Sequence, residues 1–477
     1  MKMVKSLLLG TAAGLVAIAG AQAADLPVKA KPVDYVRICS AYGAGFYYIP
    51  GTDICLRVGG YVFIESGWNA RAGTAYIYNY NIGGNSILNR DDNRINWRTR
   101  GDLILDARSQ TAIGTVRTYI SIGADYNNFS NGNAPGLVAT TSGIGASSLI
   151  AAGNITPYLE RAFIQFAGFT AGQAASFFDF GAFYSIYGLS SIAWNWLPLF
   201  AYTAQFGNGV SATISLEDGQ AHRSLIPTAA TPVPWTGTVA NISTGYGGQV
   251  SPDIVANVRV DQAWGSAQVS GALHQLRLNE VFSTAAGGIS DGWGWAVLGG
   301  IEIKTPMIAP GDSIMLQGVW SRGAVEYTGI SASPLASIAS VGLRSSGLAF
   351  GGPAFMVFDA FAFAGGSLEL TTAWSANLMF RHFWQPNLRS AFWVGHNKVE
   401  TPANSQGVAA GFPTDLTIWQ VGGNIIWSPA PTLDLSLDAL WTRVAVGACP
   451  GNAAPTTSGC DQSADIWSFW TRWRRNF

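Results

Sequence analysis

Large apolar and polar side chains alternate at every second position along many stretches of this chain. The pattern is clearest in residues 467–477, where one set of alternate positions holds Trp467, Phe469, Trp473 and Phe477. The intervening positions hold Ser468, Arg472, Arg474 and Asn476. A period of two puts successive side chains on opposite faces of an extended chain, so this stretch is predicted to be a β-strand with one apolar face.

The same alternation recurs in three stretches near the other end of the chain. In 55–68, Val58, Val62 and Ile64 share one face, and Glu65 lies on the other. In 93–108, the apolar face carries Ile95, Trp97, Leu103 and Leu105. In 111–125, it carries Val116, Ile120 and Ile122. We therefore expect an all-β chain.

Short and long connections alternate between the predicted strands. Short turns are expected near 109–110, 167–172, 207–208, 263–265, 305–311, 385–387 and 428–431. Long loops are expected near 69–92, 126–157, 178–197, 218–251, 277–291, 323–350, 399–413 and 447–462. Short periplasmic turns and longer external loops are typical of outer-membrane barrels, and eight long loops predict sixteen strands. Residues 351–382 resemble two strands around 364–366, which would give seventeen segments, so one of the two is expected not to span.

Composition supports a membrane barrel. Charged residues make up 12% of the chain and hydrophobic residues 48%, whereas soluble domains have roughly 25% charged residues. After the N-terminal region, no segment gives the 18 or more consecutive apolar residues of a membrane-spanning helix. Helices and closed barrels are the two structures that satisfy every backbone group in lipid. The sequence therefore predicts a transmembrane antiparallel β-barrel, with Trp473 and Phe477 anchoring its last strand at the membrane interface.

The N-terminus has the features of a secretory signal. Lys2 and Lys5 precede the apolar run 7–19, and Ala21-Gln22-Ala23 fits a cleavage site. We expect a signal peptide over 1–23, an irregular segment over 24–54 and the barrel over 55–477. The formal net charge of −1 gives no basic excess for a nucleic-acid partner. The expected location is the bacterial outer membrane, with its lipid as the immediate partner.

The four cysteines fall into two close pairs, Cys39 with Cys55 and Cys449 with Cys460. Local pairing into two disulfides suits an oxidising compartment, although four cysteines allow three connectivities. The chain lacks the spacing of a zinc or redox motif.

Arginines occupy the polar faces of the second to fourth predicted strands. Arg94, Arg98 and Arg100 lie on one strand and Arg117 on the next, while Arg161 lies in a segment whose alternation is ambiguous. Because neighbouring strands would hold these guanidinium groups in one sector of the wall, they predict a positive stripe lining the interior. A compatible alternative is that they pair with Glu65, Asp102 and Asp106.

Catalytic and metal-binding patterns are weak. The histidines His222, His274, His382 and His396 lack the spacing of metal ligands, and the G-x-S-x-G match at 288–292 falls in a predicted loop. The sequence predicts no catalytic residues, no metal and no cofactor.

Several stretches together resemble the porin family of alphaproteobacterial outer membranes. They are residues 36–62, 161–180, 366–374, 382–390 and 473–477. The resemblance implies a sixteen-stranded barrel, a homotrimer and passive diffusion of ions and small hydrophilic solutes. It also implies that the third long loop folds into the lumen and narrows it, with acidic loop groups facing basic wall groups.

The expected third loop, near 178–197, departs from that family pattern because Asp179 is its one charged residue. The stretch is otherwise rich in aromatic and small side chains, which permits an aromatic-lined constriction that is anion-leaning or more selective. The alternative is that the loop packs on the wall and leaves the electric field of the lumen to other residues. A general diffusion porin is the leading hypothesis. A substrate-selective or gated channel is the alternative, followed by a barrel enzyme or an adhesin.

Overall fold

The computed structural model describes residues 37–68, 95–127, 155–181, 184, 195–224, 226, 246–279, 291–332, 341–343, 357–363, 367–403, 415–447 and 463–477. The chain forms two compact units, Met1–Cys55 and Leu56–Phe477. The described part of the first unit contains a short 3-10 helix, η2 (Ser40–Tyr42), and a two-residue strand, β1 (Tyr47–Tyr48). A disulfide joins Cys39 to Cys55, with the two Cα atoms 5.9 Å apart.

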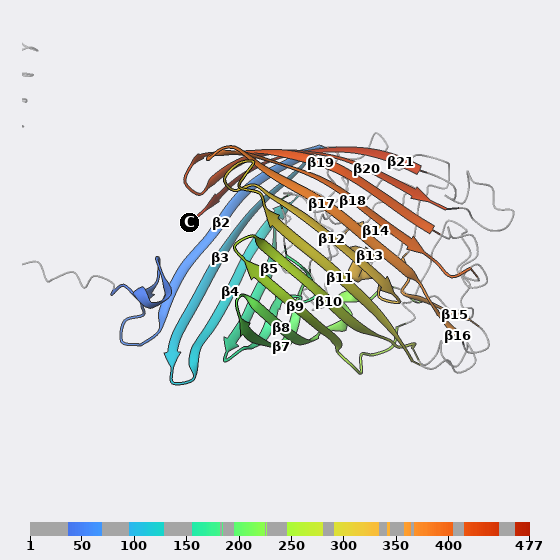
Figure 1. The fold of residues 1–477 in the computed structure, drawn as a ribbon, viewed down its shortest axis with the longest axis horizontal. Coiled ribbons are helices and arrows are strands. Elements are labelled where there is room, and N and C mark those ends of the chain that lie inside the picture. Colours follow the sequence, from blue (N-terminus) through green and yellow to red (C-terminus); the bar gives the residue numbers. More distant parts are fainter. Residues whose placement is uncertain are drawn as a thin grey trace, which may run out of the picture. The chain divides into compact units, whose positions relative to one another are not determined.

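The second unit is a sixteen-stranded antiparallel β-barrel (Figure 1). Its strands are β2 (Cys55–Trp68), β3 (Ile95–Thr111), β4 (Gly114–Asn127), β5 (Ile155–Phe166), β6 (Phe169–Ala175), β7 (Trp196–Gly207), β8 (Val210–Glu217), β9 (Asp253–Gln262), β10 (Gly265–Leu276), β11 (Gly292–Lys304), β12 (Ser313–Arg322), β17 (Thr372–Gln385), β18 (Leu388–Glu400), β19 (Asp415–Ala430), β20 (Leu433–Val446) and β21 (Ser463–Asn476). Each strand pairs with the next, and β21 pairs back onto β2 from Tyr61↔Asn476 to Trp68↔Phe469. Because this last pairing closes the sheet, the predicted fold class is confirmed.

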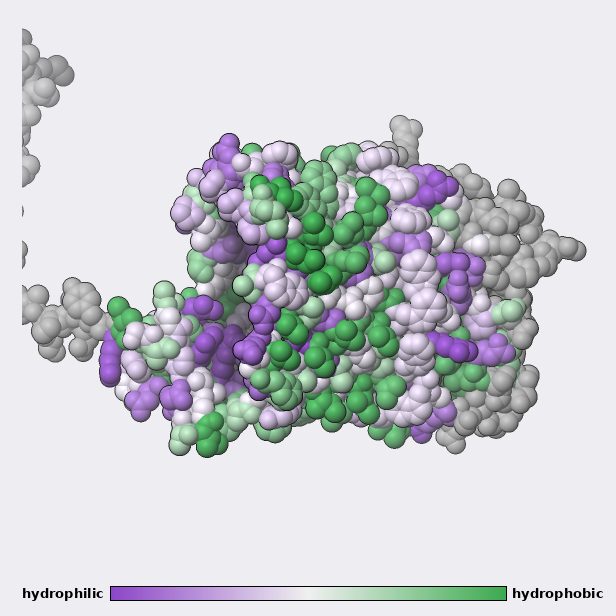
Figure 2. All heavy atoms as spheres, viewed as in Figure 1, coloured by the Kyte–Doolittle hydropathy of each residue, from purple (hydrophilic) through white to green (hydrophobic). Residues whose placement is uncertain are grey.

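Alternation along the strands separates an apolar outer face from a polar inner face. Leu103 and Ile122, which are register partners on β3 and β4, point outward and are 42% and 47% exposed. Asp102 and Ser121 next to them point inward and are buried. Hydrophobic residues gather over the middle of the strands on the face seen in Figure 2. This is the arrangement that a lipid-embedded barrel with a hydrated interior requires.

The short connections are tight turns whose backbones adopt positive φ values. Ala167, Asn208 and Thr432 lie in this region with φ of 48°, 49° and 64°. The first turn was predicted at 109–110, but β3 continues to Thr111 and the turn falls at 112–113. The polar residues at 109–110 belong to β3, because Gln110 pairs with Thr115 of the neighbouring strand β4.

The surplus segment near residue 360 does not cross the membrane. β15 (Ala360–Phe363) and β16 (Ser367–Leu370) form a separate two-stranded hairpin, and the spanning strand β17 begins at Thr372. β13 (Ile330–Ala332) and β14 (Val341–Leu343) form another small sheet. Two 3-10 helices, η3 (Gly219–His222) and η4 (Val325–Thr328), also lie outside the barrel sheet. Within the described residues, helices of the length and apolarity needed to cross a membrane are not found.

Candidate functional site in the barrel lumen

The inward faces of β2, β3 and β21 share one buried carboxylate. Glu65 on β2 contacts Arg98 Nε at 2.5 Å and Arg472 Nε at 2.6 Å, so it joins the strands on either side of its own. The Glu65 side chain is fully buried, whereas the side chains of Arg98 and Arg472 are 18% and 13% exposed. One carboxylate thus holds two guanidinium groups in place on the wall of the lumen, and the group of three side chains carries a net positive charge.

Two further carboxylates hold the arginines of β3 and β4. Arg100 donates through Nε and Nη2 to the two oxygens of Asp125 at 2.5 Å each. Arg117 donates in the same two-pronged way to Asp106 at 3.0 Å, and Arg108 shares that carboxylate at 2.7 Å. Planar two-bond pairing fixes the orientation of a guanidinium group, so these cations cannot swing freely across the lumen.

Aromatic rings make cation–π contacts with several of these arginines. Phe63 on β2 lies under the guanidinium carbons of Arg98, Arg100 and Arg472, at 5.2, 5.7 and 4.6 Å from its ring centroid. Arg100 also lies 4.4 Å from the Tyr158 ring centroid. Such cation–π contacts stabilise a partly desolvated guanidinium without neutralising its charge.

A β-bulge explains why the alternation around Arg161 was ambiguous. The register between β4 and β5 pairs Ser121 with Arg161 and then Ile122 with Leu159, which leaves Glu160 as the extra residue. Leu159 is exposed on the outer face, whereas Glu160 is 7% exposed and accepts a hydrogen bond from Ser121 Oγ at 2.9 Å. A bulge locally changes the direction of the side chains that follow it. Arg161 accordingly contacts Glu160 at 3.4 Å and inward-facing Tyr119 at 5.2 Å from its ring centroid.

The arginines of the lumen that were not predicted as lining residues include Arg381, Arg472 and Arg474. Arg472 and Arg474 stand on the polar face of the last strand, so the period-two pattern already assigned them to the interior. Arg474 lies 4.1 Å above the Tyr61 ring centroid. Arg381 on β17 lies 4.6 Å above the Tyr184 ring centroid and donates to Ser313 Oγ at 3.1 Å. The side chain of Arg94 lies outside the described residues.

The described start of the loop after β6 runs against inward-facing side chains of distant strands. Gln268 on β10 donates to the carbonyls of Phe178 and Asp179, and Arg259 on β9 donates to the Phe180 carbonyl at 2.9 Å. Phe180 packs over Gly300 of β11, where a Cβ atom would lie 2.6 Å from its ring. The chain between β6 and β7 therefore reaches the wall formed by β9, β10 and β11.

Tyr184 extends the same loop to further strands. Its hydroxyl contacts Glu302 on β11 and Ser313 on β12, and its carbonyl accepts from Asn424 Nδ2 on β19 at 3.2 Å. Burial and the neighbouring Glu302 carboxylate raise the pKa of this phenol, so it acts as a hydrogen-bond donor at neutral pH.

Asp179 is the one acidic side chain at the described start of this loop. Its side chain is half-buried, and burial raises its pKa to about 6 although backbone N–H groups and Arg259 favour the charged form. The predicted acidic side of a constriction is therefore weak, as the composition of the loop indicated.

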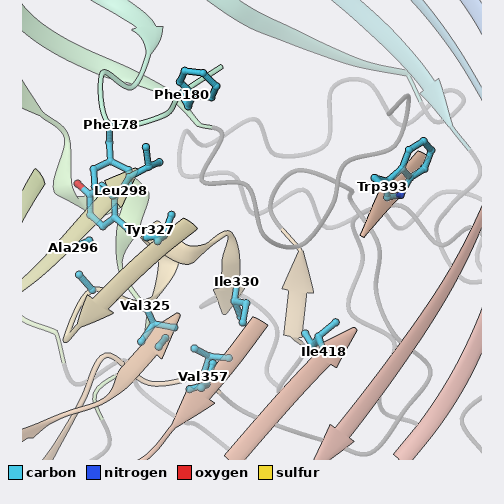
Figure 3. Close-up of a cluster of buried hydrophobic side chains, with 14 of the residues drawn as sticks. Phe178, Phe180, Ala296, Leu298, Val325, Tyr327, Ile330, Val357, Trp393 and Ile418 are labelled. Atoms are coloured by element: carbon cyan, nitrogen blue, oxygen red, sulfur yellow. The ribbon is translucent and has the colours of Figure 1, made fainter. Parts of the chain in front are cut away.

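Part of the inner wall is apolar and covered. Phe178 lies beside Leu298 and Tyr327 in a buried cluster that includes Ala296, Val325 and Val357 (Figure 3). The ring centroids of Phe178 and Tyr327 are 4.7 Å apart. The arginine sector on β2–β5 and β21 and this covered sector on β9–β12 give the lumen two different walls.

The remaining predicted residues are the four cysteines and the two aromatic membrane anchors. The Cys39–Cys55 disulfide is confirmed, whereas Cys449 and Cys460 lie outside the described residues. Trp473 and Phe477 are 58% and 66% exposed on the outer face. Within the described ranges, clusters of three or more His, Cys, Asp or Glu side chains suited to a metal ion are not found.

The tryptophans of the strands mostly face outward. Exposed examples are Trp293, Trp295, Trp419, Trp427, Trp467 and Trp473. Outward tryptophans suit an aromatic belt at the membrane interface, and this placement contradicts a stacking path for solutes along the lumen built from these six residues.

Comparisons with known proteins agree with this architecture. The family model of the porin subfamily matches residues 25–469. Porin Omp2b of Brucella melitensis and that of Brucella canis are each 31% identical over 335 residues, which cover 67% of this chain and 75% of theirs. The outer membrane channel DcaP of Acinetobacter baumannii has a similar fold, with a TM-score of 0.58 at 14% identity over 90% of this chain and 99% of that one. The chain belongs to the porin subfamily.

Proposed function

We propose that this barrel is an outer-membrane porin through which ions and small hydrophilic solutes diffuse down their gradients. The observation that carries the proposal is the charged inner wall of a closed sixteen-strand barrel with an apolar outer face. A barrel of this strand number has room for an aqueous channel, whereas eight strands are filled by side chains. A solute that follows the charged wall avoids the cost of entering hydrocarbon.

The charge of the wall favours anions. Arginines outnumber carboxylates in the sector formed by β2–β5 and β21. The arginines are Arg57, Arg98, Arg100, Arg108, Arg117, Arg161, Arg472 and Arg474, and the carboxylates are Glu65, Asp102, Asp106, Asp125 and Glu160. Because arginine stays protonated at all ordinary pH values, this excess is permanent. Asp179 adds one carboxylate at the start of the loop after β6, which offsets part of this excess above about pH 6.

The loop after β6 forms the constriction in this proposal. The contacts of Phe178, Phe180 and Tyr184 with β9–β12 support a path across the lumen. Selectivity then depends on the width between this loop and the arginine sector and on the charges that line the gap.

A planar-bilayer measurement of reversal potential tests the proposal. A membrane separating concentrated from dilute potassium chloride should show discrete conductance steps and a potential that reports anion preference. Cation preference would contradict the charge argument, and the absence of conductance from a folded barrel would contradict the channel itself.

A substrate-selective channel is the second candidate. The observation that favours it is the apolar sector covered by Phe178, Tyr327 and their neighbours, which reduces the part of the lumen left for solutes. A selective channel would show its ionic current blocked by a particular class of solute at low concentration, whereas a general porin would show weak and similar block by all small solutes.

Trimeric assembly is part of the proposal and rests on the family. Conductance that closes in three equal steps, together with a trimeric mass of the protein in detergent, would support it. A monomeric mass with single-step closure would contradict it.

A further inference from the structure

A buried polar network lies among the ends of β8, β9 and β10 and the segments that pack there. Its centre is Asp253, the first residue of β9, which is 1% exposed. Asp253 accepts a hydrogen bond from Tyr327 Oη at 2.7 Å and lies 2.8 Å from His274 Nδ1. Across the strand pair, it stands opposite the buried Glu217.

His274 connects this centre to a second carboxylate. Its Nε2 atom lies 3.2 Å from Tyr246 Oη, and that hydroxyl donates to Asp359 Oδ2 at 2.8 Å. Asp359 also accepts the backbone N–H groups of Ser224 at 2.6 Å and Val325 at 2.9 Å. One aspartate thus joins the segments that carry η3, η4 and β15.

Both nitrogens of His274 face oxygen atoms, Nδ1 the Asp253 carboxylate and Nε2 the Tyr246 hydroxyl, and an imidazolium would donate to both. Nδ1 faces a carboxylate, which accepts hydrogen bonds when ionised. When Tyr246 gives its one hydroxyl proton to Asp359, its oxygen can accept from Nε2–H. A histidine that donates at both nitrogens is an imidazolium. In that form the ring lies between Asp253 and Asp359 and places a positive charge next to both side chains.

The network reaches the loop after β6 by two routes. Tyr327, held by Asp253, packs its ring against Phe178 and stacks on His222 with 4.0 Å between centroids. Glu217 accepts Ser176 Oγ at 2.6 Å and the Phe177 backbone N–H at 3.0 Å, directly where the loop leaves β6. The start of the loop and the Phe178 side chain are therefore both held by this network.

We propose that His274 is a positioning residue that sets the width of the channel through Asp253, Tyr327 and Phe178. The inference rests on the proposed function, because it assumes that the loop after β6 limits conduction. The groups that face the network and determine its charge are Asp253, Asp359, Glu217, His222, Tyr246, Tyr327 and Arg223. Deprotonation of His274 removes the Nε2–H donor, frees Tyr246 to turn from Asp359 to the ring nitrogen, and leaves the two aspartates without their shared cation.

The first test is the pH profile of single-channel conductance of the full-length wild-type protein in a planar bilayer. We expect conductance to be constant near neutral pH and to rise on the alkaline side as His274 loses its proton and the loop loosens. A flat profile through this range would overturn the inference while leaving the porin function intact. Absence of any conductance would instead contradict the proposed function.

Two variants and a matched control complete the test. His274→Gln should lose the pH-dependent rise and conduct at neutral pH as the wild type does at alkaline pH. Tyr246→Phe removes one hydroxyl and should shift the rise toward lower pH. The control is His396→Gln, because His396 lies on the outer face between Trp374 and Trp419, at 4.7 and 4.1 Å between ring centroids.

Folding is checked by heat-dependent mobility in electrophoresis and by circular dichroism. If His274→Gln fails to fold, Tyr246→Phe still decides the matter. Conductance and pH dependence equal to those of the wild type in a folded Tyr246→Phe variant would overturn the proposed connection.

Discussion

Gly60 and Phe477 exchange both of their backbone hydrogen bonds, at 3.1 and 3.0 Å. This pair extends the β2–β21 ladder that closes the barrel, beyond its last register partners Tyr61 and Asn476. A Cβ atom on Gly60 would lie 2.8 Å from Phe477 Cζ and closer still to the Asp102 carbonyl. The absence of a side chain at residue 60 therefore allows the closing strand and β3 to approach.

Gly60→Ala should weaken this closure. We expect a loss of about 1–3 kcal/mol in unfolding free energy, the usual cost of forcing an extra carbon into a packed site. The measurement is the temperature at which the barrel loses its compact mobility in electrophoresis. Gly101→Ala is the matched control on β3, because a Cβ atom there would have open space around it. Equal melting of the two variants would contradict the argument.

Glu65→Gln should leave Arg98 and Arg472 without their shared anion. Removing one member of a buried ion pair costs about 3–5 kcal/mol, so we expect a clear fall in thermal stability. The same substitution adds net positive charge to the lumen and should increase anion preference. A variant with wild-type stability and wild-type reversal potential would show that solvent already screens this pairing.

Arg98→Ala combined with Arg117→Ala should lower anion preference, measured as the reversal potential in a salt gradient. Both side chains belong to the inward sector, so their loss reduces the positive excess there. Arg443→Ala is the control, because Arg443 is exposed on β20 and pairs with Asp465 at 3.8 Å. An unchanged potential in the double variant would mean that carboxylates already cancel the two cations.

Asp179 should make selectivity depend on pH. Its pKa of about 6 lies above the usual value near 3.9 for an aspartate in an unfolded chain. The folded protein therefore binds more protons between these values, and Asp179 lowers stability as pH rises through this window. The carboxylate is charged above about pH 6, so anion preference should increase as pH falls through that value.

Asp179→Asn isolates this effect from the titration of other carboxylates. The variant should show a reversal potential that changes less between pH 5 and 7, at the level of the wild type in acid. Identical profiles for the variant and the wild type would place Asp179 away from the conducting path.

Cys39→Ser with Cys55→Ser should loosen the first unit locally. Closing a loop of this size contributes about 3 kcal/mol by restricting the unfolded chain, and Cys39, Cys55 and Phe46 form their own buried cluster. We expect faster proteolysis within 37–55, read by mass spectrometry, with unchanged β-sheet content. Resistance equal to that of the wild type would show that other contacts hold this segment.

The strands could be predicted from sequence because a membrane barrel imposes a strict period of two. Residues 55–68 were predicted as a strand with the bounds that β2 has, since its outer residues must be apolar and its inner ones polar. The ambiguity at Arg161 arose because a bulge adds one residue, and only the register of the partner strand reveals it.

The hairpin β15–β16 shows another limit of the periodic pattern. Its residues alternate in the way that those of a spanning strand do. Counting it together with β17 gave seventeen predicted strands in place of sixteen. Phe361 is 1% exposed, so its apolar side chain is covered by protein and not by lipid. Sequence alone does not distinguish these two apolar surroundings.

The inward-facing arginines could be predicted from the polar faces of the strands, but the ion pair between Glu65 and Arg472 could not. Glu65 and Arg472 are 407 residues apart along the chain, and the closure of the barrel brings them together. The network around His274 was also hidden, because its members come from three strands and several loops. Scattered histidines were noted in the sequence without any indication that one would lie between two aspartates.

Single-channel recording of the purified full-length protein in a planar lipid bilayer measures whether the barrel conducts and which ions it prefers. We expect discrete, ohmic conductance steps and a reversal potential of the sign that reports anion preference. A folded and inserted barrel that carries no current would contradict this expectation.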